Sequence, residues 1–205
     1  MLAILRAAAD LDVRYRVGLQ VVVATGMRRG EACGLRWSDI DSDHRTLMID
    51  EAVIPAEGGA AVKSPKTRAG IRRVAVDSGT IAALAELRLA QCELAAVCDV
   101  SVRDDGFVLS MEPGGVTPLH PDSLSHAFAT ARELAGVAPE LHLHSLRHFQ
   151  ATALDAVISE RQRQSRLGWS TVHMARHYTD AVDEEDRRAA EHLGRLLSMN
   201  GDPQA

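Results

Sequence analysis

The spacing of apolar residues along the chain predicts a series of helices that short strands interrupt once. Residues 13–26 (VRYRVGLQVVVATG) are mostly apolar and end at Gly26, a typical helix stop. Apolar residues at helical spacing predict a helix over residues 145–157, and further helices are expected over about residues 2–10, 30–37, 79–98, 123–136, 160–167 and 183–198. The chain is therefore expected to be mainly helical.

Strands are predicted in the first half of the chain. Residues 46–54 (TLMIDEAVI) and 71–76 (IRRVAV) are rich in β-branched residues and are bounded by turn residues. Residues 58–63 (GGAAVK) supply a third short strand between them. The expected fold class is mainly α with a small antiparallel β-sheet (α+β), in one domain without an internal repeat.

Length and composition fit a globular protein. The chain has 205 residues, of which 46% are apolar and 25% are charged. No apolar run approaches the ~20 residues of a membrane span, and no signal peptide opens the sequence. The odd set of cysteines, without metal-ligand spacing, is interpreted as buried thiols in a reducing cytoplasm: Cys33, Cys92 and Cys98.

The net charge of −5 argues mildly against nucleic-acid binding, but the distribution of charge matters more than the total. Residues 61–76 contain no acid and five basic residues: Lys63, Lys66, Arg68, Arg72 and Arg73. A second basic cluster, facing either DNA or solvent, comprises Arg161, Arg163 and Arg166. Acids gather over residues 180–186. A basic face with an acidic back is one arrangement that this pattern allows.

Four short patterns contain candidate functional residues. They are ATGMRRGEACGLRW around Arg28, SPKTRAGIRRVAV around Lys66, HLHSLRHFQAT with His144 and Arg147, and RLGWSTVHMARHYTD from Trp169 to Tyr178. Each pattern is short enough to occur by chance. In this order and with these predicted elements between them, the sequence resembles the tyrosine recombinases of the phage-integrase family.

The resemblance implies a role for each matching position. Arg28, His144, Arg147 and Tyr178 would be catalytic, with Lys66 on a β-hairpin and Trp169 in the position that holds histidine or tryptophan. Glu31 and His148 would support the site, and the DNA-binding residues would be Arg29, Lys63, Arg68 and Arg72. Lys63 is the alternative to Lys66 at the hairpin tip. The implied fold is the catalytic-domain fold of DNA breaking-rejoining enzymes.

The chemistry explains these residue types. Attack on a DNA phosphodiester builds negative charge on two non-bridging oxygens, and an arginine offers two parallel donors to them. Tyrosine, with an ordinary pKa of about 10, is a better nucleophile beside cations that favour its phenolate. The resemblance implies a 3′-phosphotyrosine intermediate at Tyr178, with neither metal nor ATP, and Lys66 as general acid for the leaving 5′-hydroxyl.

Two other functions fit parts of the sequence. One is a DNA-binding relative that has lost activity. The other is a metal-dependent hydrolase built on His142, His144 and His148, although no partnering carboxylate cluster is evident. A chelator distinguishes them, because a recombinase keeps cleaving in EDTA.

The resemblance also predicts the domain organisation and the partners. Residues 1–182 would form the catalytic domain, and residues 183–205 a C-terminal helix and tail. Ala189, Leu193, Leu196 and Leu197 would dock that helix either on a neighbouring protomer or on its own domain. The N-terminal DNA-clamp domain of the family is not expected in this chain. The expected partner is double-stranded DNA, with four full-length protomers on two DNA sites, whereas this chain alone would be a monomer in the bacterial cytoplasm or nucleoid.

Overall fold

The computed structural model describes residues 1–57, 59–64, 70–168 and 184–198. Its helices are α1 (Leu2–Ala7), α2 (Val13–Thr25), α3 (Arg29–Gly34), α4 (Ser78–Val97), α5 (Pro121–Leu134), α6 (His144–Ala153), α7 (Glu160–Leu167) and α8 (Glu184–Ser198). Its strands are β1 (Ile40–Asp41), β2 (Thr46–Ile49), β3 (Ala52–Ala56), β4 (Gly59–Lys63) and β5 (Arg72–Ala75). The predicted fold class, mainly helical with small antiparallel sheets, is confirmed.

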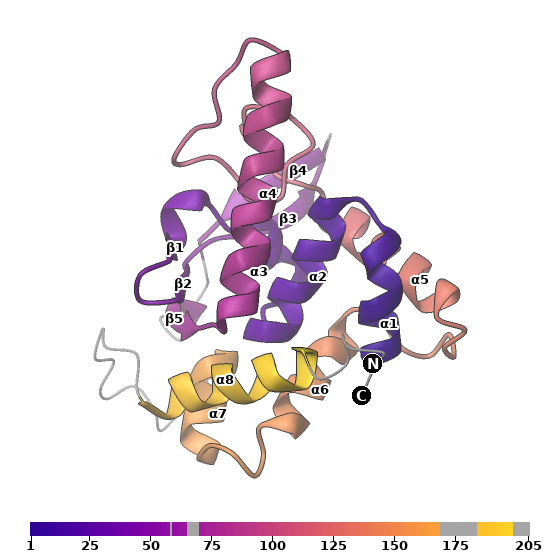
Figure 1. Cartoon of the computed structure of the whole chain (residues 1–205), viewed down its shortest axis with the longest axis vertical. Coiled ribbons are helices and arrows are strands. Elements are labelled where there is room, and N and C mark those ends of the chain that lie inside the picture. The colour runs from indigo at the N-terminus through magenta and orange to yellow at the C-terminus, as the bar shows by residue number, and fades with distance from the viewer. Residues whose placement is uncertain (58, 65–69, 169–183, 199–205) are drawn as a thin grey trace.

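Helix α2 forms the centre of the domain. Its second half is buried on every side, as expected for a helix with apolar residues all around, and α3, α4, α5, α6 and α8 all contact it. In Figure 1, α4 rises above this body, whereas α6, α7 and α8 lie together at the opposite end. The C-terminal end of α2 therefore faces the cluster of α6, α7 and α8.

The strands form two sheets where the sequence predicted one. Strand β2 pairs with β1 and β5, while β3 and β4 form a separate antiparallel hairpin. Residues 46–54 are thus two strands, because the polar pair Asp50 and Glu51 interrupts the run and the carboxylate of Glu51 accepts a hydrogen bond from Arg36 Nε at 2.8 Å. Strand β5 is left at the edge of its sheet.

The helix predicted over residues 30–37 is shorter than expected. It ends at Gly34, and Leu35 is extended. Arg36 then forms a β-bridge with Phe107, and its guanidinium lies 4.1 Å from the centre of that ring. Trp37 opens a short 3₁₀ turn. The bridge and the cation–π contact, both distant in sequence, take the chain out of the helix.

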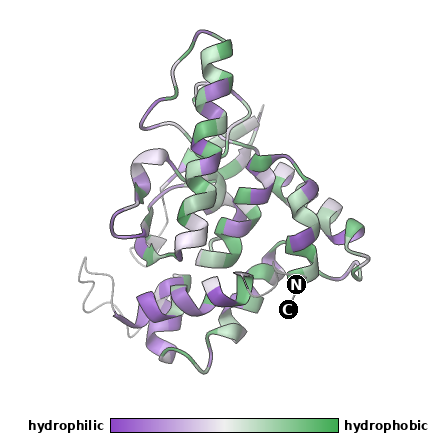
Figure 2. Cartoon of the chain, in the orientation of Figure 1, coloured by the Kyte–Doolittle hydropathy of each residue, from purple (hydrophilic) through white to green (hydrophobic). Residues whose placement is uncertain are grey.

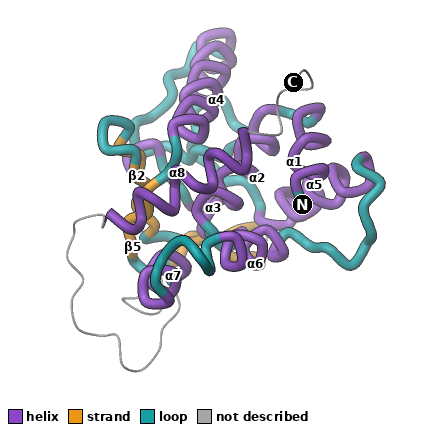
Figure 3. The backbone as a smooth tube through the Cα atoms, turned by 60° about the horizontal axis from the view of Figure 1, so that its bottom comes forward, coloured by secondary structure: helices purple, strands orange, loops and turns teal. Residues whose placement is uncertain are grey.

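Helix α8 packs on its own domain. Ala189 and Leu193 are buried in a small apolar cluster with Leu154 and Ile158. Figure 3 shows α7 and α8 beside strand β5. Docking of this helix on a neighbouring protomer stays a prediction.

The thiols differ from the sequence interpretation. Cys33 is buried, but Cys92 and Cys98 are exposed near the end of α4. That end of the helix projects away from the body (Figure 1), and both thiols lie on its exposed side.

Candidate active site

The C-terminal end of α2 organises the site. Gly26 ends the helix with φ +68°, a left-handed conformation that favours glycine. A Cβ at this position would lie 2.2 Å from Gln150 Oε1 and 2.5 Å from Leu167 Cδ2. Glycine is therefore required for both backbone conformation and space, and it allows α6 and α7 to approach the helix end.

Arg28 is the N-cap residue of helix α3. Its backbone is extended, and the Glu31 carboxylate accepts from Arg28 N at 2.8 Å, as the third residue of a capping box does. The same carboxylate also pairs with Arg28 Nη1 at 2.9 Å. The Arg28 side chain is 51% exposed. The cap thus fixes the base of Arg28 while leaving much of its guanidinium accessible to a ligand.

Glu31 is shared with a second, buried arginine. Arg72 Nη1 and Nη2 donate to the two carboxylate oxygens at 3.2 and 2.9 Å. Burial by itself raises the pKa of Glu31, but the hydrogen bonds and charges of Arg72 and Arg28 outweigh it and lower that pKa. Glu31 is consequently an anion that holds two arginines.

Arg147 reaches the same place from α6. It is buried, and it donates to the backbone oxygens of Gly26 and Leu167. Burial, together with the positive charges of Arg28 and Arg72, lowers the pKa of Arg147 to about 10. Both of these arginines lie near it, because Gly26 is two residues before Arg28, and Leu167 follows Arg166, whose backbone oxygen accepts from Arg72.

His144 lies one turn before Arg147 on α6. Its ring contacts that of His148 edge-on, with the ring centroids 4.8 Å apart. Partial burial, and then the charges of His148, Arg147 and Arg28, lower the pKa of His144 below 6.5. The imidazole is therefore neutral at pH 7, a form that can either donate or accept a proton.

Arginines outnumber carboxylates at this site in the described part of the chain. Arg28 and Arg72 both bind Glu31, and Arg147 reaches the backbone at Gly26, two residues before Arg28. The surplus positive charge in a partly buried place favours an anion with several oxygens, such as a phosphate.

Arg72 differs from its expected role. It was predicted to bind DNA, but its side chain is 1% exposed, and it also donates to the backbone oxygens of Gly70 and Arg166. An arginine that is completely paired inside the protein presents no surface to a duplex. Arg72 instead supports Glu31.

The second basic cluster is divided. Arg166 is completely buried, Arg163 pairs with the exposed Asp155 and Glu160, and Arg161 is exposed. Figure 2 colours α7 and the first turns of α8 as hydrophilic, yet Arg166 and Asp186 are buried there.

The remaining predicted residues fall in three places. Lys63 ends strand β4 and is exposed, and Arg29 pairs with Asp122 at 2.6 Å on the surface. Lys66, Arg68, Trp169 and Tyr178 lie outside the described residues. The structure thus brings together Arg28, Glu31, His144 and Arg147, with His148 beside them.

One site residue was missed by the sequence reasoning. Gln150 is completely buried, and its side-chain amide donates to Ala24 O at 3.0 Å in the last turn of α2. The available signal was a polar residue three positions after Arg147, on the same face of α6. Gln150 and Arg147 together satisfy carbonyls that a helix end leaves unpaired.

The described part of the chain has neither a candidate metal site nor a candidate membrane span. The described ranges contain no group of three histidine, cysteine, aspartate or glutamate residues that could hold a metal ion. No helix in the same ranges is long and apolar enough to cross a membrane.

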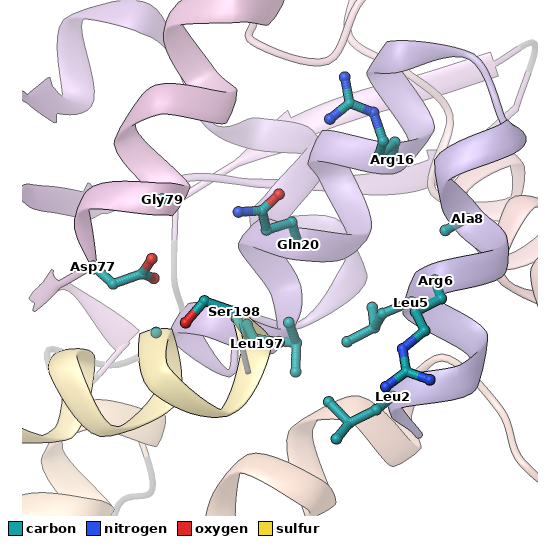
Figure 4. Close-up of a pocket in the computed structure, with 12 residues that line it drawn as sticks. Leu2, Leu5, Arg6, Ala8, Arg16, Gln20, Asp77, Gly79, Leu197 and Ser198 are labelled. Carbon is teal, nitrogen blue, oxygen red and sulfur yellow. The ribbon is translucent and has the colours of Figure 1, made fainter. Parts of the chain in front are cut away.

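A cavity of about 300 Å³ lies elsewhere, between α1, α2, the start of α4 and the end of α8. Figure 4 shows Leu2 and Leu5 on α1, Gln20 on α2 and Leu197 on α8 around it. None of the predicted catalytic residues that the structure describes lines this cavity, and Arg28, His144 and Arg147 lie elsewhere.

The fold and the site define a class: a helical domain that presents Arg28 at the start of α3 and both His144 and Arg147 on α6. The sequence pattern of the phage integrase family matches residues 1–185. The chain therefore belongs to the phage integrase family.

Individual relatives agree with this assignment. A tyrosine recombinase XerC-like protein of Caldanaerobacter subterraneus is 29% identical over 198 residues, which cover 90% of this chain and 50% of that protein. The chain spans about half the length of the curated relatives that it matches.

Solved structures show the same fold. An integrase of transposon Tn1549, in complex with transposon right-end DNA, has a TM-score of 0.67 at 19% identity, covering 94% of this chain and 62% of that one. A lambda integrase tetramer bound to a Holliday junction has a TM-score of 0.54 at 21% identity, covering 84% of this chain and 46% of that one.

Proposed function

We propose that the chain is the catalytic domain of a site-specific DNA recombinase, which cuts and rejoins strands through a 3′-phosphotyrosine at Tyr178. The observation that carries the proposal is the gathering of three arginines at the end of α2, where Glu31 binds Arg28 and Arg72, Arg147 binds Gly26, and the Arg28 side chain is half exposed. The scissile phosphate would bind to Arg28 and Arg147. Family membership and the names of the relatives support the same reaction.

The described residues would act on the phosphate. Arg28, held by Glu31 but half exposed, would donate to one non-bridging oxygen, and Arg147 to the other. Donors aimed in advance at developing charge are commonly the largest catalytic contribution, roughly 3–4 kcal/mol for one donor. Arg147 would exchange part of its pairing with backbone oxygens for the phosphate, a stronger acceptor because it is charged.

The reaction would exchange one P–O bond for another. The Tyr178 oxygen forms a bond to phosphorus as the bond to the 5′ oxygen breaks. The phenol proton leaves with neutral His144 as an acceptor, and the 5′ oxygen takes a proton from Lys66. Attack by a 5′-hydroxyl on the phosphotyrosine reverses these steps on a new partner strand, so that neither ATP nor a metal is consumed.

The partner would be double-stranded DNA, with Arg29, Lys63 and Arg68 contacting it outside the reacting phosphate. In the complete protein, four protomers would assemble on two DNA sites; the lambda integrase tetramer has that number of chains. The protein would act in the bacterial cytoplasm or on the nucleoid.

A trapped intermediate tests the proposal. Nicked duplexes with randomised sequence around the nick are incubated with the chain in EDTA, and covalent adducts are separated on a denaturing gel. The proposal predicts an adduct for the wild type and none for Tyr178→Phe. An adduct that survives in Tyr178→Phe, or cleavage that stops in EDTA, would contradict it. If the wild type binds the duplexes without forming any adduct, the chain is an inactive DNA-binding relative.

A further inference from the structure

A second pair of charged residues is buried next to the site and takes no part in the proposed cleavage of DNA. Arg166 Nη1 lies 2.5 Å from Asp186 Oδ1, and the two side chains are 0% and 3% exposed. Arg166 belongs to the last turn of α7 and Asp186 to the first turn of α8. In sequence, the two residues flank the segment that includes Trp169 and Tyr178.

The pair binds backbone groups of two other elements. Arg166 Nη2 donates to Ala24 O at 2.7 Å and to Ala75 O at 2.9 Å, and Asp186 Oδ2 accepts from Ala75 N at 2.5 Å. Ala75 ends the edge strand β5, so the pair satisfies an N–H and a C=O that would otherwise lack a neighbouring strand. Ala24 lies in the last turn of α2.

Both of these elements hold the catalytic arginines. Ala24 is two residues before Gly26, whose oxygen accepts from Arg147. On strand β5, Arg72 donates from Nε to the backbone oxygen of Arg166 at 2.9 Å and binds Glu31, which in turn holds Arg28. A continuous chain of buried contacts therefore joins the first turn of α8 to both arginines of the site.

Stability alone does not account for such a pair. Replacing a buried ion pair by apolar residues of similar volume is often neutral or stabilising, because burial removes the hydration of both charges. Apolar side chains cannot, however, bind Ala24 O, Ala75 O and Ala75 N at once. These contacts fix the direction of the α2 end and of β5 relative to α7 and α8.

Building on the proposed function, we infer that Arg166 and Asp186 are positioning residues for DNA cleavage. They set the relative placement of Arg28 and Arg147 from outside the reacting centre. Their loss slows the bond-breaking step while DNA affinity remains, because neither side chain is accessible to DNA.

The test uses the double variant Arg166→Met with Asp186→Leu, which removes both charges and retains apolar volume. Arg163→Met is the matched control, because it removes an arginine of the same helix whose partners, Asp155 and Glu160, are exposed. For each variant we would measure the melting temperature, the affinity for nicked duplex, and the single-turnover rate of adduct formation at saturating DNA. Hydrogen exchange of the amides of residues 24–28 is measured in parallel.

The inference predicts that the folded double variant binds DNA within about threefold of wild type but forms adduct about tenfold to a hundredfold more slowly. Arg163→Met should match wild type in both measurements. An adduct rate for the folded double variant within threefold of wild type would overturn the inference. If the double variant does not fold, Asp186→Asn, which keeps the side-chain shape, is judged by the same criteria.

The hydrogen-exchange measurement separates this inference from the proposed function. If wild-type protein forms no adduct, the proposed function fails and the exchange result decides the inference. Exchange of amides 24–28 about tenfold faster than wild type in the folded variant would support positioning. Unchanged exchange would overturn it.

Discussion

A cluster of three arginines and a buried ion pair meet at the end of α2, and the two groups differ in their ratio of arginines to carboxylates. Around Glu31, one carboxylate holds Arg28 and Arg72 while Arg147 approaches from α6. Around Asp186, one carboxylate holds one arginine, Arg166. Among the described residues, the first group has three arginines to one carboxylate, and one of these arginines, Arg28, is half exposed. The second group has one arginine and one carboxylate, and both side chains are buried. The surplus suits an incoming phosphate, whereas the neutral pair suits a fixed scaffold.

Breaking the neutral pair should have the largest effect on stability. Asp186→Leu alone leaves Arg166 as an unpaired buried charge, which costs about 3–5 kcal/mol of unfolding free energy. The double variant with Arg166→Met should lose much less. Urea unfolding of the three proteins checks this. A single variant as stable as the double variant would show that the pair is not buried as described.

Removing Arg147 from the unbalanced cluster should affect cleavage more than stability. Arg147→Ala is expected to lower the adduct rate at saturating DNA by about 10²–10³. Arg132→Ala is the matched control, since Arg132 also donates to two backbone oxygens, those of Pro139 and Leu141, but on α5. Single-turnover kinetics measures both. Equal rates for the two variants would contradict a catalytic role for Arg147.

The close approach of α6 and α7 to α2 predicts a steric effect at Gly26. Gly26→Ala combines a strained φ of +68° with contacts of 2.2 and 2.5 Å, whereas Gly136→Ala has a φ of +62° and no atom within 4 Å of the new Cβ. Both variants should lose about 1–2 kcal/mol to the backbone strain. Gly26→Ala should lose a further 1–3 kcal/mol or so to overpacking. Thermal unfolding compares them, and equal losses would argue against close packing at Gly26.

The smallest expected effect concerns pH. Because the folded protein lowers the pKa of His144, the unfolded chain binds its proton more readily. The stability that a neutral His144 contributes is complete above pH 6.5 and is lost as the pH falls through the lowered pKa. His144→Asn should therefore be less sensitive than wild type to acidification between pH 7 and 5, as measured by urea unfolding. Identical pH profiles would contradict the shift.

Much of the helical framework could be predicted because its signals are local. Gly26 ends α2 as expected, and α7 and α8 lie where the sequence predicted helices. The order of the strands was less accessible. Residues 46–54 look like one strand, and only the pairing partners, β5 and β4, show that they are two.

The roles of the arginines depend on contacts that no local pattern reveals. Arg72 and Arg166 look like surface charges in sequence, but their partners, Glu31 and Asp186, lie 41 and 20 residues away. A buried carboxylate turns a potential DNA contact into an internal support. Arg28 and Arg147 were identifiable because a family pattern marks them, not because their burial could be foreseen.

A change in the substrate tests most directly whether Arg147 stabilises the negative charge of the scissile phosphate. A nicked duplex carries a methylphosphonate at the scissile position, where a methyl group replaces one charged oxygen. Wild type and Arg147→Ala are compared on this duplex and on the ordinary phosphodiester. We expect the loss of about 10²–10³ on the phosphodiester to shrink to about tenfold or less on the methylphosphonate, because the methyl group removes one of the two charged oxygens that the arginines would stabilise. An equal loss on both substrates would contradict it.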